Sequence, residues 1–360
     1  SGEVILPAFT IASCAYAIKR VGATPIFVDI EPDYFCINPQ KVEQLININT
    51  KAIMIVNMYG NTTDVDSFLA LRDKYSIPII EDCSENLGGE YKGYKSGSQF
   101  DVSTFSLYAN KTITSGEGGL LITQNKEIAS KARLIRNHGE NAIEHYNIKD
   151  LSNIIGSNYR FTELQAAIGI EQFKKLKNIL NHRAQIAKVL DSRLQNINGI
   201  EIQKLDKDCS HAYYMYPIKF DPNTFEISRN LFVKAVIAEL PKAKFWDTTP
   251  MAEAYIKPLY LNPIYQNKLA IGEKGFPWIV NKQNKYDYSE GICPVTEDLY
   301  NNKLIISPLV REGISERDIN DFGDAIEKVI ENIDNLKSNI SSKSDQEIYD
   351  PLKAMEENLD

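Results

Sequence analysis

The chain lacks several features that would place it in a membrane, outside the cell or on a nucleic acid. No uninterrupted apolar run reaches the roughly 18 residues that a membrane-spanning helix needs. The first residues, Ser1–Pro7, do not have the basic-then-apolar layout of a signal peptide. The formal net charge of −8 offers no general attraction for phosphate backbones. These absences predict a cytoplasmic protein with neither a membrane nor a nucleic acid as its partner.

Cysteine and histidine are scarce and scattered along the sequence. The five cysteines are odd in number and contain no Cys-x-x-Cys pair. This usage is typical of a reducing compartment, in which thiols mostly pack as small apolar residues. The four histidines show no metal-ligand spacing with one another or with the cysteines. We therefore expect no metal site.

The first 125 residues alternate short apolar runs with segments of helical periodicity. We expect strands at 3–6, 24–29, 52–57, 77–81, 102–107 and 119–123, and helices at 11–21, 39–45 and 65–75. Asp64 is a plausible N-cap for the third of these helices. Nearly continuous apolar runs separated by helices indicate an α/β fold, a buried and mostly parallel sheet with helices on both faces.

The rest of the chain predicts a long helix and then a smaller α+β domain. A helix at 126–136, with Asn125 as N-cap, precedes a polar loop at 139–157 and a long helix from Thr162 to about residue 194. A strand at 212–220, a helix at 229–239, an aromatic loop region at 245–278, a strand at 304–307 and a helix at 316–333 follow. We thus expect a large domain at 1–195, a small C-terminal domain at 196–334 and a polar tail at 335–360.

Two polar residues follow the predicted strands where a ligand would bind. Asp82 ends the strand at 77–81, and Lys111 follows the strand at 102–107. Ligands of parallel sheets bind at the carboxyl ends of the strands. A pyridoxal phosphate (PLP) site needs such a pair, a lysine that forms a Schiff base and an aspartate that keeps the pyridine nitrogen protonated. By position alone, Lys111 fits better as one of the many solvated surface lysines, and Asp82 could as well cap a helix or pair with an arginine.

Five segments together resemble the DegT/StrS-type sugar aminotransferases, which are PLP enzymes of fold type I. The segments are 81–88, 105–119 and 156–167, with weaker similarity at 22–29 and 293–297. The resemblance runs from Val4 to about Ile333 and implies a sheet of the seven-stranded type found in aspartate aminotransferase, with PLP as the cofactor. The family normally carries some tens of residues before Val4, including a turn that grips the cofactor phosphate. We therefore expect the PLP domain to be incomplete at its N-terminus.

The resemblance also implies a role for each matching residue. Lys111 would be the catalytic lysine, and Asp82 would bind the pyridine nitrogen. Glu85 matches a position, often glutamine in relatives, that contacts the phenolic oxygen of the cofactor. Ser106 would bind the phosphate. Asn158 would reach the phosphate in the partner subunit of a homodimer with shared sites, and Tyr108 and Tyr159 would line the substrate cleft.

The implied activity is the transfer of an amino group from glutamate or glutamine to a keto group of a nucleotide-linked deoxysugar, in the biosynthesis of amino sugars and surface polysaccharides. One alternative is an aminotransferase that acts on a cyclitol. A second is a sugar dehydratase of the same fold, but these relatives replace the lysine with histidine, and Lys111 argues against it. A third is a non-catalytic, truncated paralogue with a regulatory or assembly role.

Overall fold

A computed structural model describes residues 2–139, 154–241, 249–281 and 286–340. Its largest sheet has six strands in the order β2-β1-β3-β4-β7-β8, all parallel except β8, which runs antiparallel to β7. The strands are β1 (Glu3–Pro7), β2 (Thr24–Val28), β3 (Thr50–Val56), β4 (Ile79–Asp82), β7 (Val102–Ser106) and β8 (Gly119–Ile122). All six were predicted from apolar runs. The seventh strand, which only the resemblance implied, is not part of this sheet in the described residues.

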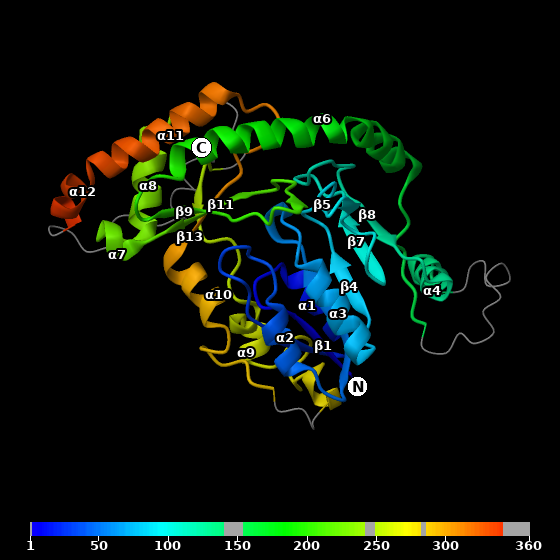
Figure 1. The fold of residues 1–360 in the computed structure, drawn as a ribbon. Helices are drawn as coiled ribbons and strands as arrows, with labels where there is room; N and C mark the ends of the chain where they lie inside the picture. Colours follow the sequence, from blue (N-terminus) through cyan, green and yellow to red (C-terminus); the bar gives the residue numbers. More distant parts are fainter. Residues whose placement is uncertain (1, 140–153, 242–248, 282–285, 341–360) are drawn as a thin grey trace.

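Alternate side chains of the large sheet pack on two different layers, as the two-residue period of a strand requires. On one face, Ile5, Ile53 and Ile55 pack against helices α2 (Pro39–Leu45) and α3 (Val65–Tyr75). On the other face, Leu6 and Val56 pack against α1 (Ala12–Arg20) and against side chains from 259–306. Figure 1 shows the labelled strands of this sheet running from β1, low in the molecule, to β7 and β8 at the right, with α1, α2 and α3 beside them.

The helices with clear start signals have the bounds that the sequence predicted. These are α2, α3, α4 (Lys126–Arg136) and α8 (Arg229–Glu239). The Asp64 side chain accepts a hydrogen bond from the Ser67 amide, and Asn125 accepts from the amides of Glu127 and Ile128. Both side chains therefore cap the helices as expected.

The long helix α6 (Glu163–Leu194) joins the two parts of the fold. Thr162 and Gln165 form a capping box at its start. Its first turns lie beside β8, and it runs across the upper part of the molecule in Figure 1. Near its end, Ile186, Leu190 and Leu194 are buried in the core of the second sheet.

The second sheet has four antiparallel strands in the order β12-β13-β11-β9. They are β9 (Ile200–Ile202), β11 (Tyr216–Phe220), β12 (Ala252–Glu253) and β13 (Leu304–Ser307), and a short sheet of β5 (Glu90–Tyr91), β6 (Tyr94–Lys95) and β10 (Cys209–Ser210) lies apart from it. Helix α8, the end of α6 and α11 (Glu316–Glu331) cover the four-stranded sheet. Helix α12 (Ile333–Ile340) follows α11, so the predicted closing helix ends at Glu331 and a second helix begins. The remainder of the predicted tail, 341–360, lies outside the described residues.

The strand predicted at 212–220 is shorter than expected. β11 begins only at Tyr216, because the preceding backbone pairs with the short helix η1 (Met58–Gly60) and not with the sheet. The Ala212 amide donates to the Gly60 carbonyl, and the Tyr214 amide donates to the Tyr59 carbonyl, both at 2.8 Å. This pairing with η1 brings Tyr214 to the carboxyl end of the large sheet. Most of the predicted loop at 139–157, and Phe245 of the aromatic region, lie outside the described residues.

Part of the aromatic region is buried against the large sheet, whereas Leu269, Ile271 and Phe276 are exposed. Tyr260 and Tyr265 are fully buried, and the Tyr265 ring packs edge-on against Phe27 of β2 at 5.1 Å between centroids. Two further helices lie near here, η2 (Leu259–Leu261) and α9 (Pro263–Gln266). The C-terminal half of the chain thus supplies part of the core of the large sheet.

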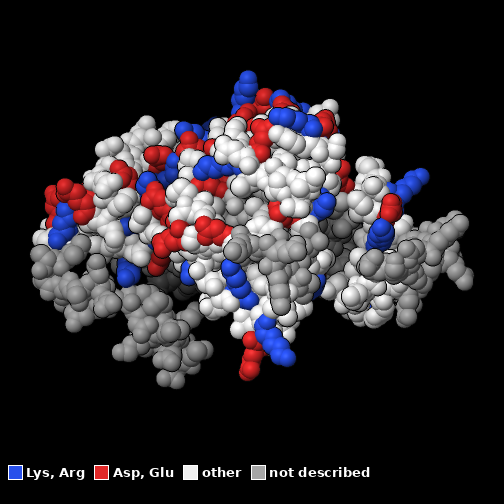
Figure 2. Space-filling view, turned by 90° about the horizontal axis from the view of Figure 1, so that it is seen from below, with Lys and Arg blue, Asp and Glu red and all other residues white. Residues whose placement is uncertain are grey.

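Charged residues of both signs are mixed on the molecular surface. On the face shown in Figure 2, lysine and arginine are interspersed with aspartate and glutamate and form no large basic patch. Among the described helices, none has both the length and the apolar character needed to cross a bilayer. All five cysteines are free thiols.

Candidate active site

A cavity of about 310 Å³ opens at the carboxyl end of the large sheet. Its walls come from the start of α1, the ends of β3, β4 and β7, the loop after β7, and two tyrosines from the C-terminal half of the chain. The lining residues are Thr10, Ile11, Ser13, Val56, Asp82, Ser84, Glu85, Ser106, Tyr108, Lys111, Tyr214 and Tyr255. The structure therefore brings together five of the seven residues predicted for the site.

The amine of Lys111 lies between an acid and an aromatic ring. Its backbone amide donates to the Tyr108 carbonyl at 3.0 Å, which closes the turn after β7. Its Nζ lies 3.9 Å from Oε1 of Glu85 and 4.3 Å from the centre of the Tyr214 ring. The side chain is only 14% exposed. A cation over a tyrosine face is attracted by the ring quadrupole, so Lys111 does not resemble a solvated surface lysine.

Asp82 is the last residue of β4, and its carboxylate has three partners. Oδ1 accepts hydrogen bonds from the amide (2.9 Å) and the hydroxyl of Ser84. Oδ2 accepts from the Cys14 thiol at 3.2 Å. Burial, and then the charge of Asp82, raise the pKa of Cys14 well above its ordinary value. The thiol therefore stays protonated and remains a donor to the carboxylate.

Glu85 is the second acid of the cavity and is more deeply buried. Oε2 accepts from the Tyr59 amide at 2.8 Å, and Oε1 accepts from the Tyr255 hydroxyl at 3.0 Å. Burial raises the pKa of Glu85, although the charge of Lys111 and these two hydrogen bonds oppose that rise. Tyr59 has a left-handed backbone (φ 60°), which is uncommon for a bulky residue.

Ser106 and Tyr108 lie at the mouth of the same cavity. Ser106 ends β7, and its Oγ accepts a hydrogen bond from the Tyr108 amide at 3.2 Å. A hydroxyl that accepts in this way keeps its own proton for another acceptor, such as a phosphate oxygen. The Tyr108 side chain is exposed.

Asn158 and Tyr159 do not line this cavity. Asn158 is exposed, and its Oδ1 accepts from the Arg160 amide at 3.3 Å. The Tyr159 hydroxyl accepts from the Arg20 guanidinium at 3.0 Å, and its ring lines a groove beside β8 and α4. Within one chain, therefore, both lie apart from the cavity that holds Lys111.

Two tyrosines of the cavity, Tyr214 and Tyr255, were not predicted. Each lies more than 100 positions after Lys111, and no local sequence pattern distinguishes either from the 19 tyrosines of the chain. The hydroxyls of Thr10 and Ser13, at the start of α1, were also missed.

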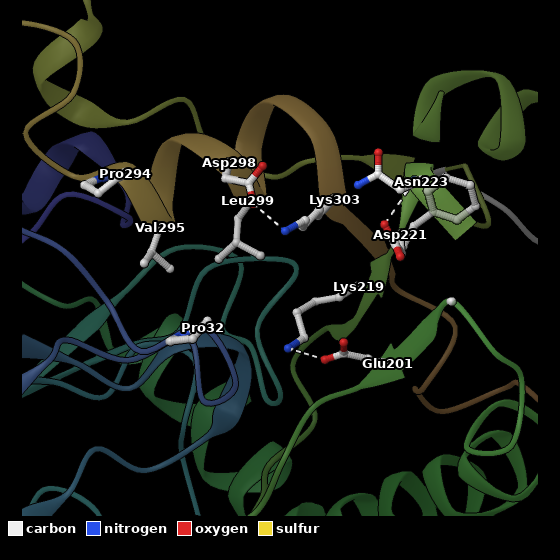
Figure 3. A pocket seen from close by; sticks show the side chains of 12 residues that line it. Pro32, Glu201, Lys219, Asp221, Asn223, Pro294, Val295, Asp298, Leu299 and Lys303 are labelled. Atoms are coloured by element: carbon white, nitrogen blue, oxygen red, sulfur yellow. Dashed lines mark hydrogen bonds and ion pairs between the residues drawn. The ribbon is translucent and has the colours of Figure 1, made fainter. Parts of the chain in front are cut away.

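A larger hollow of about 620 Å³ lies between the second sheet and α10 (Pro294–Asp298). Figure 3 shows its charged side chains in pairs, Lys219 with Glu201 and Lys303 with Asp298. Lys219 also lies 2.5 Å from Asp33. Because these lysines already have carboxylate partners, they offer little to a ligand. The cavity at Lys111 is the better candidate for chemistry, although it is smaller.

The residues of that cavity fit the cofactor that the resemblance implied. It presents an amine at Lys111, an accessible carboxylate at Asp82 and the hydroxyl of Ser106, which are groups suited to an aldehyde, a pyridinium nitrogen and a phosphate. Ile11 and Val56 supply apolar surface. The donor set therefore matches PLP.

Comparison with known proteins agrees with this chemistry. Residues 1–278 match the DegT/DnrJ/EryC1/StrS aminotransferase family. The GDP-perosamine synthase of Escherichia coli O157:H7 is 34% identical over 309 residues, which cover 84% of this chain and 80% of that protein. The L-glutamine:2-deoxy-scyllo-inosose aminotransferase of Streptoalloteichus tenebrarius is 30% identical over 348 residues, or 93% and 78% of the two chains.

Solved structures show the same fold. Helicobacter pylori PseC, an aminotransferase involved in the biosynthesis of pseudoaminic acid, superposes with a TM-score of 0.73 at 25% identity, over 92% of this chain and 80% of its own. The predictions of the fold class, the family and the PLP cofactor are thereby confirmed. The chain belongs to the DegT/DnrJ/EryC1/StrS aminotransferase family, and it is a PLP-dependent aminotransferase of fold type I.

Proposed function

We propose that this enzyme transfers an amino group from glutamate or glutamine to a keto group of a nucleotide-linked deoxysugar, for the synthesis of amino sugars in surface polysaccharides. The observation that carries the proposal is the position of the Lys111 amine, which lies in one cavity with the carboxylates of Asp82 and Glu85. The similarity to GDP-perosamine synthase supports a sugar nucleotide as the acceptor. The five free cysteines are consistent with a reducing, cytoplasmic compartment.

Four residues of the cavity have defined roles in this proposal. Bound PLP supplies the electron sink that stabilises negative charge at the carbon losing its proton. Lys111 holds the cofactor and then carries the proton at its Nζ. Asp82, kept in place by Ser84 and Cys14, holds a proton on the ring nitrogen. Ser106 would donate a hydrogen bond from its hydroxyl to the phosphate, and Tyr108, at the mouth of the cavity, would contact the acceptor sugar.

A cyclitol aminotransferase is the second candidate. It is favoured by the similarity to an L-glutamine:2-deoxy-scyllo-inosose aminotransferase, which extends over 93% of this chain. The use of L-glutamine that the name of this relative states also supports glutamine as an amino donor. A sugar dehydratase is not favoured, because a lysine occupies position 111.

The proposal includes a homodimer with shared active sites. Asn158 and Tyr159 are exposed and lie away from the cavity of their own chain, which suits residues that serve a partner's cavity. Five apolar side chains on β8 and α6 are exposed, and we call this area the β8/α6 face (Leu120, Leu121, Ile122, Leu164 and Phe173). Extensive exposed apolar surface typically marks a protein interface.

Absorption spectroscopy of the purified chain tests the central assignment. Incubation with PLP should produce the visible band of lysine-bound cofactor, and L-glutamate or L-glutamine should bleach it. Lys111→Ala should abolish the band and lower the amination rate by roughly 10²–10⁴-fold, the contribution typical of a positioned proton carrier. Lys174→Ala removes an exposed lysine on α6 and is the matched control, which should behave as the wild type.

The acceptor is then identified by mixing the bleached protein with keto forms of nucleotide deoxysugars and with a keto-cyclitol. Return of the visible band with the sugar nucleotide alone supports the first candidate, and return with the cyclitol alone supports the second. A band that survives in Lys111→Ala would show that another amine holds the cofactor, and the central assignment would be wrong.

A further inference from the structure

Tyr255 reaches the cavity from a part of the chain that the family motifs do not include. It follows β12, and the preceding residue, Ala254, has a left-handed backbone (φ 55°) and donates its amide to the Leu304 carbonyl at 2.8 Å. The Tyr255 ring packs edge-on against Tyr59 at 5.4 Å between centroids. Its hydroxyl is thereby fixed at the carboxylate of Glu85.

The Tyr255 hydroxyl is the closest side-chain donor to Glu85 among the described residues. It lies 3.0 Å from Oε1, whereas the Lys111 amine lies 3.9 Å from the same oxygen, beyond the range of a hydrogen bond. The other oxygen, Oε2, accepts from a backbone amide, which no side-chain substitution removes. The hydrogen bond to Oε1 is therefore the one through which a single side chain, Tyr255, can change the protonation of Glu85.

Several groups on neighbouring elements affect whether Glu85 is charged or protonated. Lys111 favours the charged carboxylate, whereas Asp82 opposes it. Tyr59 and Tyr214, and the thiols of Cys14 and Cys36, also face Glu85, and their pKa values are raised. Burial is the largest cause in each case, so these four groups stay neutral.

We propose that Tyr255 is a positioning residue that sets the protonation state of Glu85 beside the cofactor lysine. A tyrosine hydroxyl can donate to a carboxylate, and it can turn and accept from a carboxylic acid. The Tyr255 hydroxyl therefore donates to Glu85 when Glu85 is the charged partner of Lys111. It accepts from Glu85 when Glu85 is a neutral acid opposite a negatively charged oxygen of the cofactor. The proposal rests on the assignment of Lys111 as the cofactor lysine.

The hydroxyl has a second tyrosine within reach, which supports this dual role. The Tyr255 hydroxyl is near enough to that of Tyr214 to affect its pKa, and the ring of Tyr214 is the one that contacts the Lys111 amine. When Tyr255 accepts a hydrogen bond from protonated Glu85, its own hydroxyl can donate to the Tyr214 oxygen. Hydrogen bonds in such buried chains strengthen one another.

The direct test is an infrared titration of the cofactor-free chain. The carbonyl band of a protonated carboxyl, identified by its loss in Glu85→Gln, gives the pH midpoint of Glu85. Tyr255→Phe keeps the ring and removes the donor, so it should raise that midpoint by roughly one pH unit, the equivalent of one hydrogen bond to a charged group. Tyr216→Phe is the matched control. It removes a buried tyrosine hydroxyl that donates to Asp191 in the second sheet, outside the cavity, and should leave the midpoint unchanged.

A second titration follows the visible band of the PLP-loaded chain against pH. Tyr255→Phe should shift its midpoint in the wild-type background and leave it unchanged in the Glu85→Gln background, because the effect passes through Glu85. An equal shift in both backgrounds, or an unchanged infrared midpoint in Tyr255→Phe, would overturn the proposal. A wild-type chain without any visible band would instead refute the assignment of Lys111, and the infrared titration would still decide the role of Tyr255.

Discussion

His211 shows how a single buried base can make the stability of this protein depend on pH. Its side chain is buried, and its Nδ1 accepts the Tyr213 amide at 2.8 Å. Burial lowers the pKa of His211 from its ordinary value of 6.5 to about 3. The folded state therefore requires the neutral ring, whereas the unfolded chain binds a proton below about pH 6.5.

We expect the thermal midpoint to fall as the pH is lowered from about 6.5 toward 3. Over this window the unfolded state binds one more proton at this residue, which lowers the free energy of unfolding by about 1.4 kcal/mol per pH unit. His211→Asn keeps an acceptor for the Tyr213 amide but does not titrate. Its thermal midpoint, measured by scanning fluorimetry at a series of pH values, should decline less steeply than that of the wild type.

His182 provides the matched control for this prediction. It is half-buried on α6, and its Nε2 lies 3.0 Å from the Ile314 carbonyl. His182→Asn should keep the steep decline of the wild type. If both substitutions flatten the curve equally, the pH dependence does not come from the burial of His211.

The two neighbouring acids of β4 show what a sequence can and cannot reveal at the scale of residues. Glu81 and Asp82 are adjacent, but the strand turns them to opposite faces. Glu81 is buried and accepts from Asn57, Gly97 and Ser103, away from the cavity. Alternation along a strand shows that only one of the two acids can point into the cavity, but it does not show which one. Here the family resemblance identified Asp82 as that acid.

At the scale of elements, Asp29 fixes a helix from one end of the chain onto a strand from the other. Its carboxylate, just after β2, accepts from the amides of Val295 and Thr296 and from the Thr296 hydroxyl. It also pairs with Lys41 at 2.9 Å. Burial would raise the pKa of Asp29, but these partners outweigh it and lower the pKa. The first turn of α10 is thus held to the large sheet by one side chain.

Asp29→Ala should lower the free energy of unfolding by on the order of 3 kcal/mol, because the donors of α10 lose a charged acceptor. Denaturant unfolding measures this loss, and hydrogen exchange should show faster opening of 293–299. Lys41→Met, which removes only a partly exposed ion pair, should cost less than about 1 kcal/mol. Similar losses in both variants would mean that the ion pair, and not the cap, holds the helix.

Elements with local signals could be predicted from the sequence, whereas those fixed by distant contacts could not. Helices α3 and α4 begin after an aspartate and an asparagine that cap them, and their predicted bounds agree with the structure. The strand at 212–220 was predicted too long, because the backbone between Ala212 and Met215 pairs with the turn at Tyr59 and Gly60. Tyr214 and Tyr255 reach the cavity through such distant contacts, so local periodicity gave no sign of them.

At the scale of the whole molecule, the β8/α6 face is the surface that the proposed dimer would bury. The Gln165 side chain donates to the Glu117 carbonyl at 3.0 Å, which joins the start of α6 to the start of β8. Leu164 is 80% exposed and Phe173 is 60% exposed on this helix. Asn158 lies just before the same helix, so a twofold contact here could carry it into the partner's cavity.

Mixed dimers test whether the active sites are shared. Lys111→Ala and Asn158→Ala, each with its own affinity tag, should have low activity alone. If Asn158 serves the partner's cavity, a mixed dimer has one site with both residues intact. Because half of randomly assembled dimers are mixed, co-expression should restore about a quarter of the wild-type activity.

Lys111→Ala co-expressed with Asp82→Asn is the matched control. Lys111 and Asp82 line one cavity of one chain, so every site in that mixture lacks one of them and no activity should return. If activity returned only in this control mixture, Lys111 and Asp82 would belong to different active sites. If neither mixture recovers activity although light scattering shows dimers, each active site would be complete within a single chain, and Asn158 would have no role in the partner's cavity.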